Sequence, residues 1–352
     1  MDLFENVQRT ELSELGEFGL IDLLTKNIEL KNQSTLKGVG DDAAVIDVCS
    51  DKLLISTDVL IEGVHFDLTY TPLKHLGYKS VVVNLSDIAA MNGKPEQITV
   101  SIAVSNRFSV EALEELYEGI YLACNRYGID LIGGDTTTSK SGLFISITVL
   151  GKAPLEKITY RNGAQKGDLI CVSGDLGGAY IGLMVLEREK RVFEANSQIQ
   201  PDLEGYDYVL ERQLKPEPRL DIVTQLNELG VIPHAMIDIS DGLASEIIHI
   251  CKQSDVGCRL FEDKVPIDIQ TEDIAKKLGL VPVTMALNGG EDYELLFTVP
   301  QSNFEVVKAM ENISIIGYIT DKTEGMSLIT KDDKLFELKA QGWDAWLNKG
   351  KS

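Results

Sequence analysis

The chain has 352 residues, and its 33 Lys and Arg residues stand against 55 Asp and Glu residues, which gives a formal net charge of −22. A surface this acidic repels the phosphates of DNA and RNA, and no basic run provides a local exception, so we expect no nucleic-acid partner. Apolar residues make up 44% of the chain, and at about 150 residues per domain the length predicts a globular protein of about two domains.

The sequence also predicts where the protein is located and the redox state of its cysteines. The first 20 residues carry acids where a signal peptide needs a basic region, and no later run approaches the ~20 apolar residues of a membrane span. We therefore expect a cytoplasmic protein without a membrane partner. The five cysteines are scattered and form no CxxC pair, which favours reduced, mostly buried thiols.

In the first half, short apolar runs alternate with a helical pattern, which is typical of an α/β protein. The helix predicted over 109–128 has apolar residues at helical spacing, begins at Ser109 and stops at Gly128. The elements expected here, in chain order, are strands at 53–57 and 96–104, that helix, and strands at 130–132 and 143–151.

A cluster of Pro, Gly and charged residues between two strong strands predicts a domain boundary near residue 151, so the two domains are expected at 1–151 and 152–352. The elements expected in the second domain, in chain order, are a strand at 169–174, helices at 177–190 and 219–230, a strand at 235–240, a helix at 244–254 and a strand at 294–299.

Seven aspartates are interpreted as lying where an apolar strand gives way to a turn. They are Asp41, Asp42, Asp58, Asp87, Asp135, Asp238 and Asp241. Because ligands of open α/β sheets bind beyond the carboxyl ends of the strands, these carboxylates are candidates for one shared site. Converging carboxylates need a cation, and oxygen donors without His or Cys select Mg²⁺, which usually completes its shell with water and phosphates. The pattern therefore predicts a magnesium-dependent nucleotide site.

The alternative for each aspartate alone is a turn or helix-capping residue, and Asp241 in SDGLASE fits that reading. The familiar phosphate loops are missing, since the sequence has no GxxxxGK[ST], no GxGxxG that opens a βαβ unit, and no HRD or DFG set. The phosphates must then be held by metal, backbone and a few cations.

Eight motifs in fixed order resemble the thiamine-monophosphate kinase family: GDDAAV, STDVLIEGVHF, NLSDIAAM, GGDT, RNGAQKGD, SGDLGG, DISDGL and GGEDYEL. The resemblance runs from about Gly38 to Val299, with a weaker tail to Trp346. It implies direct, ATP-dependent phosphorylation of thiamine monophosphate to thiamine diphosphate. It also implies a two-domain α/β fold with mixed sheets, shared with aminoimidazole ribonucleotide synthetase, whose N-terminal sheets pair across a homodimer.

The resemblance also implies roles for individual residues. The metal ligands would be Asp42, Ser56, Thr57, Asp58, Asp87, Asp135, Asp238 and Asp241. The residues on ATP would be Tyr117, Gly134, Asp135, Arg161 and Ser240. Those on the acceptor would be His65, Glu291, Trp343 and Trp346. The catalytic set would be Asp42, Asp87, Asp241 and Arg161.

The reaction fits a site without a general base, because the acceptor phosphate has a second pKa of about 6 and is already a nucleophile at pH 7. Several Mg²⁺ ions with Arg161 would cancel the repulsion between the two phosphate groups. A Trp face and a carboxylate would both stabilise the positively charged thiazolium ring. His65 alone also fits a strand-edge cap, and the two tryptophans also fit a helix staple.

Two rivals remain open at this point. The first is another ATP-using enzyme of the superfamily. Within that group, a selenophosphate synthetase needs a reactive Cys near its N-terminus, and the position of Cys49 after the GDD motif argues against that enzyme. The other is a noncatalytic Mg-nucleotide sensor, in which His65, Glu291 and the tail aromatic, Trp343 or Trp346, would be free to vary. The sequence departs from the family pattern at Asn92-Gly93 and at Asp175, and neither departure touches a predicted metal ligand.

Overall fold

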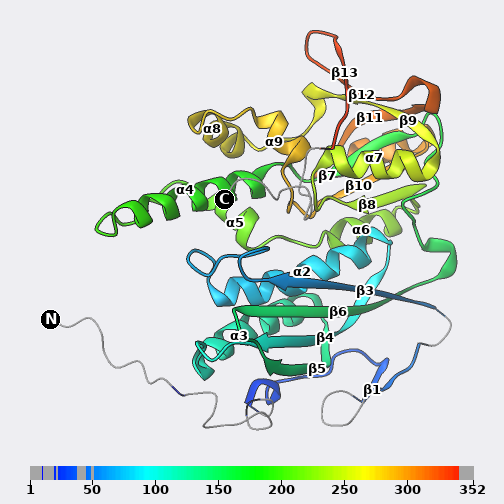
Figure 1. Ribbon diagram of the computed structural model, residues 1–352. Coiled ribbons are helices and arrows are strands. Elements are labelled where there is room, and N and C mark those ends of the chain that lie inside the picture. The colour runs from blue at the N-terminus through cyan, green and yellow to red at the C-terminus, as the bar shows by residue number, and fades with distance from the viewer. Residues whose placement is uncertain (1–9, 11–19, 21–22, 38–44, 49–50, 341–352) are drawn as a thin grey trace. The chain divides into compact units, whose positions relative to one another are not determined.

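The structure is a computed structural model that describes residues 10, 20, 23–37, 45–48 and 51–340 (Figure 1). The chain divides into two compact units, one within Met1–Ile88 and Lys94–Pro154 and the other within Ala89–Gly93 and Leu155–Ser352. Each unit has its own sheets and its own hydrophobic core.

The first unit is built on a four-stranded mixed sheet in the order β3-β6-β4-β5. Its elements are β1 (Thr35–Lys37), β2 (Val45–Ile46), β3 (Lys52–Ile61), α2 (Leu73–Ala90), β4 (Lys94–Val104), α3 (Val110–Tyr127), β5 (Asp130–Thr138) and β6 (Leu143–Ala153). Strand β6 pairs antiparallel with β3 and β4, β4 pairs parallel with β5, and β1 and β2 form a separate antiparallel pair.

Helices α2 and α3 pack on one face of this sheet, where alternate residues of β6 such as Ile145 and Ile147 are buried with Leu85 and Leu113. The two helices approach closely, because a Cβ on Gly77 would lie 1.9 Å from the Leu116 carbonyl oxygen. A larger side chain there would push the helices apart.

The predicted helix over 109–128 is confirmed as α3. The Ser109 hydroxyl accepts a hydrogen bond from the Ala112 N–H at 3.3 Å, and Gly128 ends the helix in the left-handed conformation with φ 68°. The predicted strands of this half are also confirmed, and each lies within a longer strand.

The prediction that Asp87 follows a strand is wrong, because the run VVVNLSDIAA lies in α2. From Leu76 to Ala90 almost every residue of this helix is buried. A helix buried on all sides shows no apolar period, and a short β-branched run within it resembles a strand. Asp58 and Asp135 lie inside β3 and β5, not at their ends.

The second unit is built on a seven-stranded sheet in the order β13-β12-β9-β11-β7-β10-β8, in which only β12 and β9 pair parallel. Its strands are β7 (Leu169–Ser173), β8 (Ala235–Asp238), β9 (Val256–Phe261), β10 (Leu295–Val299), β11 (Ile313–Asp321), β12 (Met326–Ile329) and β13 (Leu335–Glu337). Its α-helices are α4 (Gly178–Ala195), α5 (Asp207–Leu214), α6 (Leu220–Glu228), α7 (Leu243–Ser254), α8 (Ile269–Lys277), α9 (Pro282–Asn288) and α10 (Phe304–Ala309).

Both faces of this sheet are buried, and β7 contributes to each. Ile170 and Val172 join the core that includes residues of α7, whereas Leu169 and Cys171 join the core that includes residues of α6 and α10. This alternation is the period of two expected of a strand covered on both sides. The predicted α/β class with mixed sheets is therefore confirmed.

Two smaller observations complete the fold. Within the described part of the chain, no helix is both long and apolar enough to span a membrane. Cys124, Cys171, Cys251 and Cys258 are buried and free, as expected, and Cys49 lies outside the described residues.

Candidate active site

The first unit brings two of the predicted aspartates together. Alternation along β3 places Ser56 and Asp58 on its half-buried side and Thr57 on its exposed side. Asp87 comes from α2, and its Oδ2 accepts a hydrogen bond of 2.5 Å from the Ser56 hydroxyl. The Thr57 hydroxyl instead donates to the Ile147 carbonyl oxygen at 3.1 Å. The strand and the helix therefore present Ser56, Asp58 and Asp87 to one another.

The carboxylate of Asp87 perturbs that of Asp58. Burial, and then the charge of Asp87, raise the pKa of Asp58 from 3.8 to about 6. Such a pair has a surplus of negative charge and hard oxygen donors only, which fits Mg²⁺ held through one or two carboxylates and completed by phosphates. Among the residues that the structure describes, no group of three or more His, Cys, Asp or Glu side chains forms a metal-holding cluster.

Asp135 is not brought to this pair within the chain. It lies on β5, at the edge of the sheet opposite β3, so two strands separate it from Asp58, a distance of ~14 Å at the usual strand spacing. Its neighbour Gly134 has a packing role, since a Cβ there would lie 1.8 Å from the Val100 carbonyl oxygen.

The two remaining candidates in this unit have different surroundings. Tyr117 is buried in the core at 6% exposure and meets Tyr121 edge-on, with 6.2 Å between ring centroids. Its contact with adenine stays a prediction. His65 is exposed in the turn after β3, where its Nδ1 accepts a hydrogen bond of 3.1 Å from the Ile61 N–H.

In the second unit, the predicted DISD residues follow β8. Asp238 is the last residue of that strand and is buried at 4% exposure, and Asp241 precedes α7. The structure adds Glu246, which the motif reading missed. Its Oε1 accepts a hydrogen bond of 3.2 Å from the Asp241 N–H, and burial and the charge of Asp238 raise its pKa to about 8. The available signal was its place in the first turn of α7, directly after the motif.

Arg161 lies in the exposed loop before β7 and is close enough to act on this group. Its positive charge opposes the rise in the pKa of Glu246 and, after burial, helps to lower the pKa of His249. The structure therefore brings Arg161 near Glu246, the carboxylate on which Asp238 and Asp241 also act.

The GGEDYE segment lies against the loop between β8 and α7. The Glu291 N–H donates to the Ser240 carbonyl oxygen at 2.7 Å, and a Cβ on Gly290 would lie 2.3 Å from that oxygen. Glu291 and Tyr293 both have positive φ, at 68° and 51°, which is a strained conformation for side chains other than Gly. The Glu291 Oε2 accepts a hydrogen bond of 2.6 Å from the Gln213 amide.

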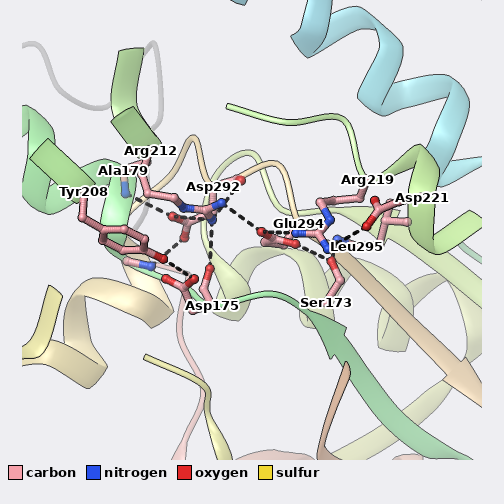
Figure 2. Close-up of polar contacts among 11 residues, drawn as sticks. Ser173, Asp175, Ala179, Tyr208, Arg212, Arg219, Asp221, Asp292, Glu294 and Leu295 are labelled. Carbon is pink, nitrogen blue, oxygen red and sulfur yellow. Dashed lines mark hydrogen bonds and ion pairs between the residues drawn. The ribbon is translucent and has the colours of Figure 1, made fainter. Parts of the chain in front are cut away.

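The alternate residues of this segment point into a buried charge network (Figure 2). Glu294 is fully buried and accepts from Arg212 at 3.0 Å, from Arg219 at 3.3 Å and from the Ser173 hydroxyl. Asp292 accepts from the Gly177 N–H at 2.7 Å and so occupies the N-terminus of α4. The network holds the strained segment in place.

Asp41, Asp42, Trp343 and Trp346 lie outside the described residues, so their predicted roles stay predictions.

Residues 40–153 match the N-terminal domain of the AIR synthase related proteins, and residues 165–328 match the C-terminal domain of that family. The chain is therefore an AIR synthase related protein. The structure of hydrogenase maturation protein HypE in complex with ATP, at 19% identity and a TM-score of 0.71, shares this fold.

Relatives with higher sequence identity identify the particular family within this group. The thiamine-monophosphate kinase of Buchnera aphidicola subsp. Schizaphis graminum is 38% identical, over 93% of this chain and 98% of its own length. That of Bacillus subtilis is 33% identical, over 94% and 98%. The solved structure of AaThiL complexed with AMPPCP and TMP has a TM-score of 0.73 at 32% identity and covers 97% of this chain and 100% of its own. This chain belongs to the thiamine-monophosphate kinase family.

Proposed function

We propose that the chain transfers the terminal phosphoryl group of ATP directly onto the phosphate of thiamine monophosphate, which yields thiamine diphosphate and ADP. The observation that carries this proposal is the full-length likeness to AaThiL complexed with AMPPCP, an ATP analogue, and TMP. The described residues supply what the chemistry requires, namely hard oxygen donors in the first unit and a cation beside carboxylates in the second.

Asp58 and Asp87, with the Ser56 hydroxyl, are the residues of the first unit that would hold Mg²⁺. Bound there, the ion would neutralise charge on the ATP phosphates. Asp42, Thr57, Asp135, Asp238 and Asp241 are the other proposed magnesium ligands. Asp135, ~14 Å from Asp58, would hold a separate ion. The repulsion between Asp58 and Asp87 supports a cation, because a divalent charge between them removes the cost of holding two carboxylates together.

Arg161 is proposed to bind the transferred phosphoryl group. A guanidinium near buried carboxylates remains charged at every working pH and donates to phosphate oxygens in pairs. Gly134 and Ser240 are proposed to contact ATP, and Tyr117 to lie near the adenine. The acceptor phosphate is already ionised at pH 7, so no side chain has to remove a proton from it.

Glu291 is proposed to bind the acceptor through the positive charge of the thiazolium ring, with His65 and the aromatic rings of Trp343 and Trp346. The strained φ of Glu291 supports this role, because such strain persists only where the surroundings impose it. A fold-only role would be served as well by glycine at this position.

A homodimer in the cytoplasm is the proposed state of the protein. The support is the face of the four-stranded sheet opposite α2 and α3, where Leu53, Ile55 and Val59 of β3 are 43%, 62% and 48% exposed. An apolar sheet face of this kind is suited to pairing with a second copy.

The proposal is tested by incubating the protein with ATP, Mg²⁺ and thiamine monophosphate and following the products by mass spectrometry. Thiamine diphosphate and ADP should appear in equal amounts. ATP binding without thiamine diphosphate would favour a noncatalytic nucleotide sensor. ADP formed without thiamine diphosphate would favour another ATP-using enzyme of the superfamily.

A further inference from the structure

We propose that Asn84 is a positioning residue that holds β3 against α2 and so presets the spacing of the Asp58 and Asp87 carboxylates before a metal ion binds. The inference rests on the proposed function, which makes these two aspartates magnesium ligands. It concerns the residue that keeps them together, which the motif reading did not single out.

Strand β3 lies at the edge of its sheet. Among the strands that the structure describes, its only partner is β6, so alternate N–H groups of β3 point away from that partner and need another acceptor. The N–H of Asp58 is one of these, and it donates to the side-chain oxygen of Asn84 at 3.0 Å. A side chain of α2 therefore takes the place of a neighbouring strand at this residue.

The side-chain amide of Asn84 has a fixed orientation. Asn84 is 1% exposed, and its Nδ2 donates to the Ser80 carbonyl oxygen of the same helix at 2.9 Å. Since the nitrogen is held by the helix, the oxygen must face β3. A buried asparagine bonded on both sides forms a rigid link between the helix and the strand.

The spacing of the residues along α2 matches the spacing of their partners along β3. Asn84 and Asp87 are three residues apart and lie on the same face of α2, while Asp58 and Ser56 are two residues apart on the same side of β3. Asn84 bonds the backbone of Asp58, and Asp87 bonds the hydroxyl of Ser56. The two contacts therefore fix the register of the helix along the strand.

The link also opposes a repulsion. Asp58 on β3 and Asp87 on α2 lie on the sides of the two elements that the hydrogen bonds of Asn84 and Ser56 join. Two ionised carboxylates so placed repel one another when no cation lies between them. The Asn84 amide is neutral and bonds the backbone, so it adds cohesion without adding charge. Groups outside the ligand set that orient ligands in this way typically change metal affinity by about 10–100-fold when they are mutated.

The test compares Asn84→Leu with wild type by titrating Mn²⁺ as the probe and following free Mn²⁺ by electron paramagnetic resonance. Leucine has the same branching and the same number of heavy atoms as asparagine, and it makes neither hydrogen bond. The dissociation constant for Mn²⁺ should rise by about 10-fold or more. The matched control is Asn227→Leu, since Asn227 also bonds the carbonyl four residues back, that of Val223 at 2.9 Å, and a second segment through Asn92 at 2.8 Å. The control should lose thermal stability and keep its Mn²⁺ affinity within about twofold.

Three outcomes are decisive. A folded Asn84→Leu protein that binds Mn²⁺ like wild type, while Asp87→Asn loses binding, overturns the positioning role and leaves the metal site standing. Wild-type Mn²⁺ binding by Asp87→Asn overturns the metal site itself. Hydrogen exchange on the metal-free wild-type protein supplies a test that needs no variant. The Asp58 amide should be as protected as the paired amides of β3, and an amide that gains protection only with Mg²⁺ contradicts the preset spacing.

Discussion

The hydroxyl of Ser56 on β3 donates a 2.5 Å hydrogen bond to the carboxylate of Asp87 on α2, and this contact joins two motifs that are 31 residues apart in the chain. It brings the STD triplet and the NLSD motif onto one side of the first unit. Asp58, on the same side of β3, completes a carboxylate pair that repels itself. The repulsion within this pair destabilises the metal-free fold, and a bound cation would relieve it.

Replacing Asp87 by Asn should reduce turnover by orders of magnitude with the fold intact. Asparagine has the same shape and can still accept from Ser56, but it removes one of two carboxylates from the proposed magnesium site. The measurement is the steady-state rate with saturating ATP and thiamine monophosphate, with circular dichroism as the check on folding. Wild-type turnover would mean that Asp87 is only a hydrogen-bond acceptor in α2.

The same substitution should leave the metal-free protein at least as stable as wild type. The charge of Asp87 contributes to raising the pKa of Asp58, so at pH 7 the native state carries a repulsion that Asn removes. Chemical denaturation in the presence of a chelator measures the free energy of unfolding. A clear loss of stability would show that the carboxylate of Asp87 makes a favourable contact that Asn cannot replace.

Activity should depend on pH through Asp58. Its pKa in the folded protein, about 6, lies above the ordinary value of 3.8, so the carboxylate takes up a proton between pH 7 and 5. Protons and Mg²⁺ compete for it, and the Mg²⁺ concentration for half-maximal activity should therefore rise as pH falls through 6. In the metal-free protein, stability changes with pH in the opposite direction to this activity. The native state binds the Asp58 proton more tightly than the unfolded chain does. The contribution of Asp58 to stability therefore grows as pH falls from 7 toward 4. A half-saturating Mg²⁺ concentration that does not change between pH 7 and 5 would contradict the assignment.

Removing Arg212 should destabilise the second unit severely. Arg212 pairs with Glu294 and lies within 3.9 Å of Asp292, and both acids are fully buried. Arg212→Leu removes the cation beside Asp292 and leaves Glu294 paired with Arg219, which costs about 3–5 kcal/mol. The exposed ion pair of Lys276 with Glu272 provides the control, and Lys276→Ala should cost less than about 1 kcal/mol. Equal shifts in melting temperature would show that the buried network does not hold the fold.

Replacing Glu291 by Gln should raise the KM for thiamine monophosphate by about 10-fold, which corresponds to about 1.4 kcal/mol, because the carboxylate that attracts the thiazolium cation is lost. The KM for ATP and the melting temperature should stay near wild type, because glutamine preserves the shape of the side chain. Glu311→Gln, at an exposed position in the same unit, is the matched control. A KM for thiamine monophosphate that does not change would remove Glu291 from the acceptor site.

The sequence was sufficient for the class of fold and for the family, and insufficient for the local placement of several acids. Amphipathic α3 was predictable from its apolar spacing and its caps at Ser109 and Gly128. Buried α2 was not, because a helix covered on all sides has no polar face to reveal its period. Asp87 was therefore predicted to be a site residue from its motif, while its secondary structure was misassigned.

The groups that support the site could not be predicted for a different reason. Asn84, Glu246 and Arg212 act through contacts with segments that are distant in sequence or through a helix register, and residue type alone does not reveal such contacts. Each lies in or beside a recognisable motif or proline-rich segment. The hydrogen bonds that give them their roles exist only in the folded chain.

The central claim is direct transfer of the terminal phosphoryl group of ATP to thiamine monophosphate, and isotope transfer tests it most directly. The protein is incubated with Mg²⁺, thiamine monophosphate and ATP whose γ-phosphoryl oxygens are labelled with oxygen-18, and the thiamine diphosphate is analysed by mass spectrometry. The account predicts that all the labelled nonbridging oxygens appear on the terminal phosphoryl group of the product. Absence of thiamine diphosphate, or a product that carries no label, would contradict it.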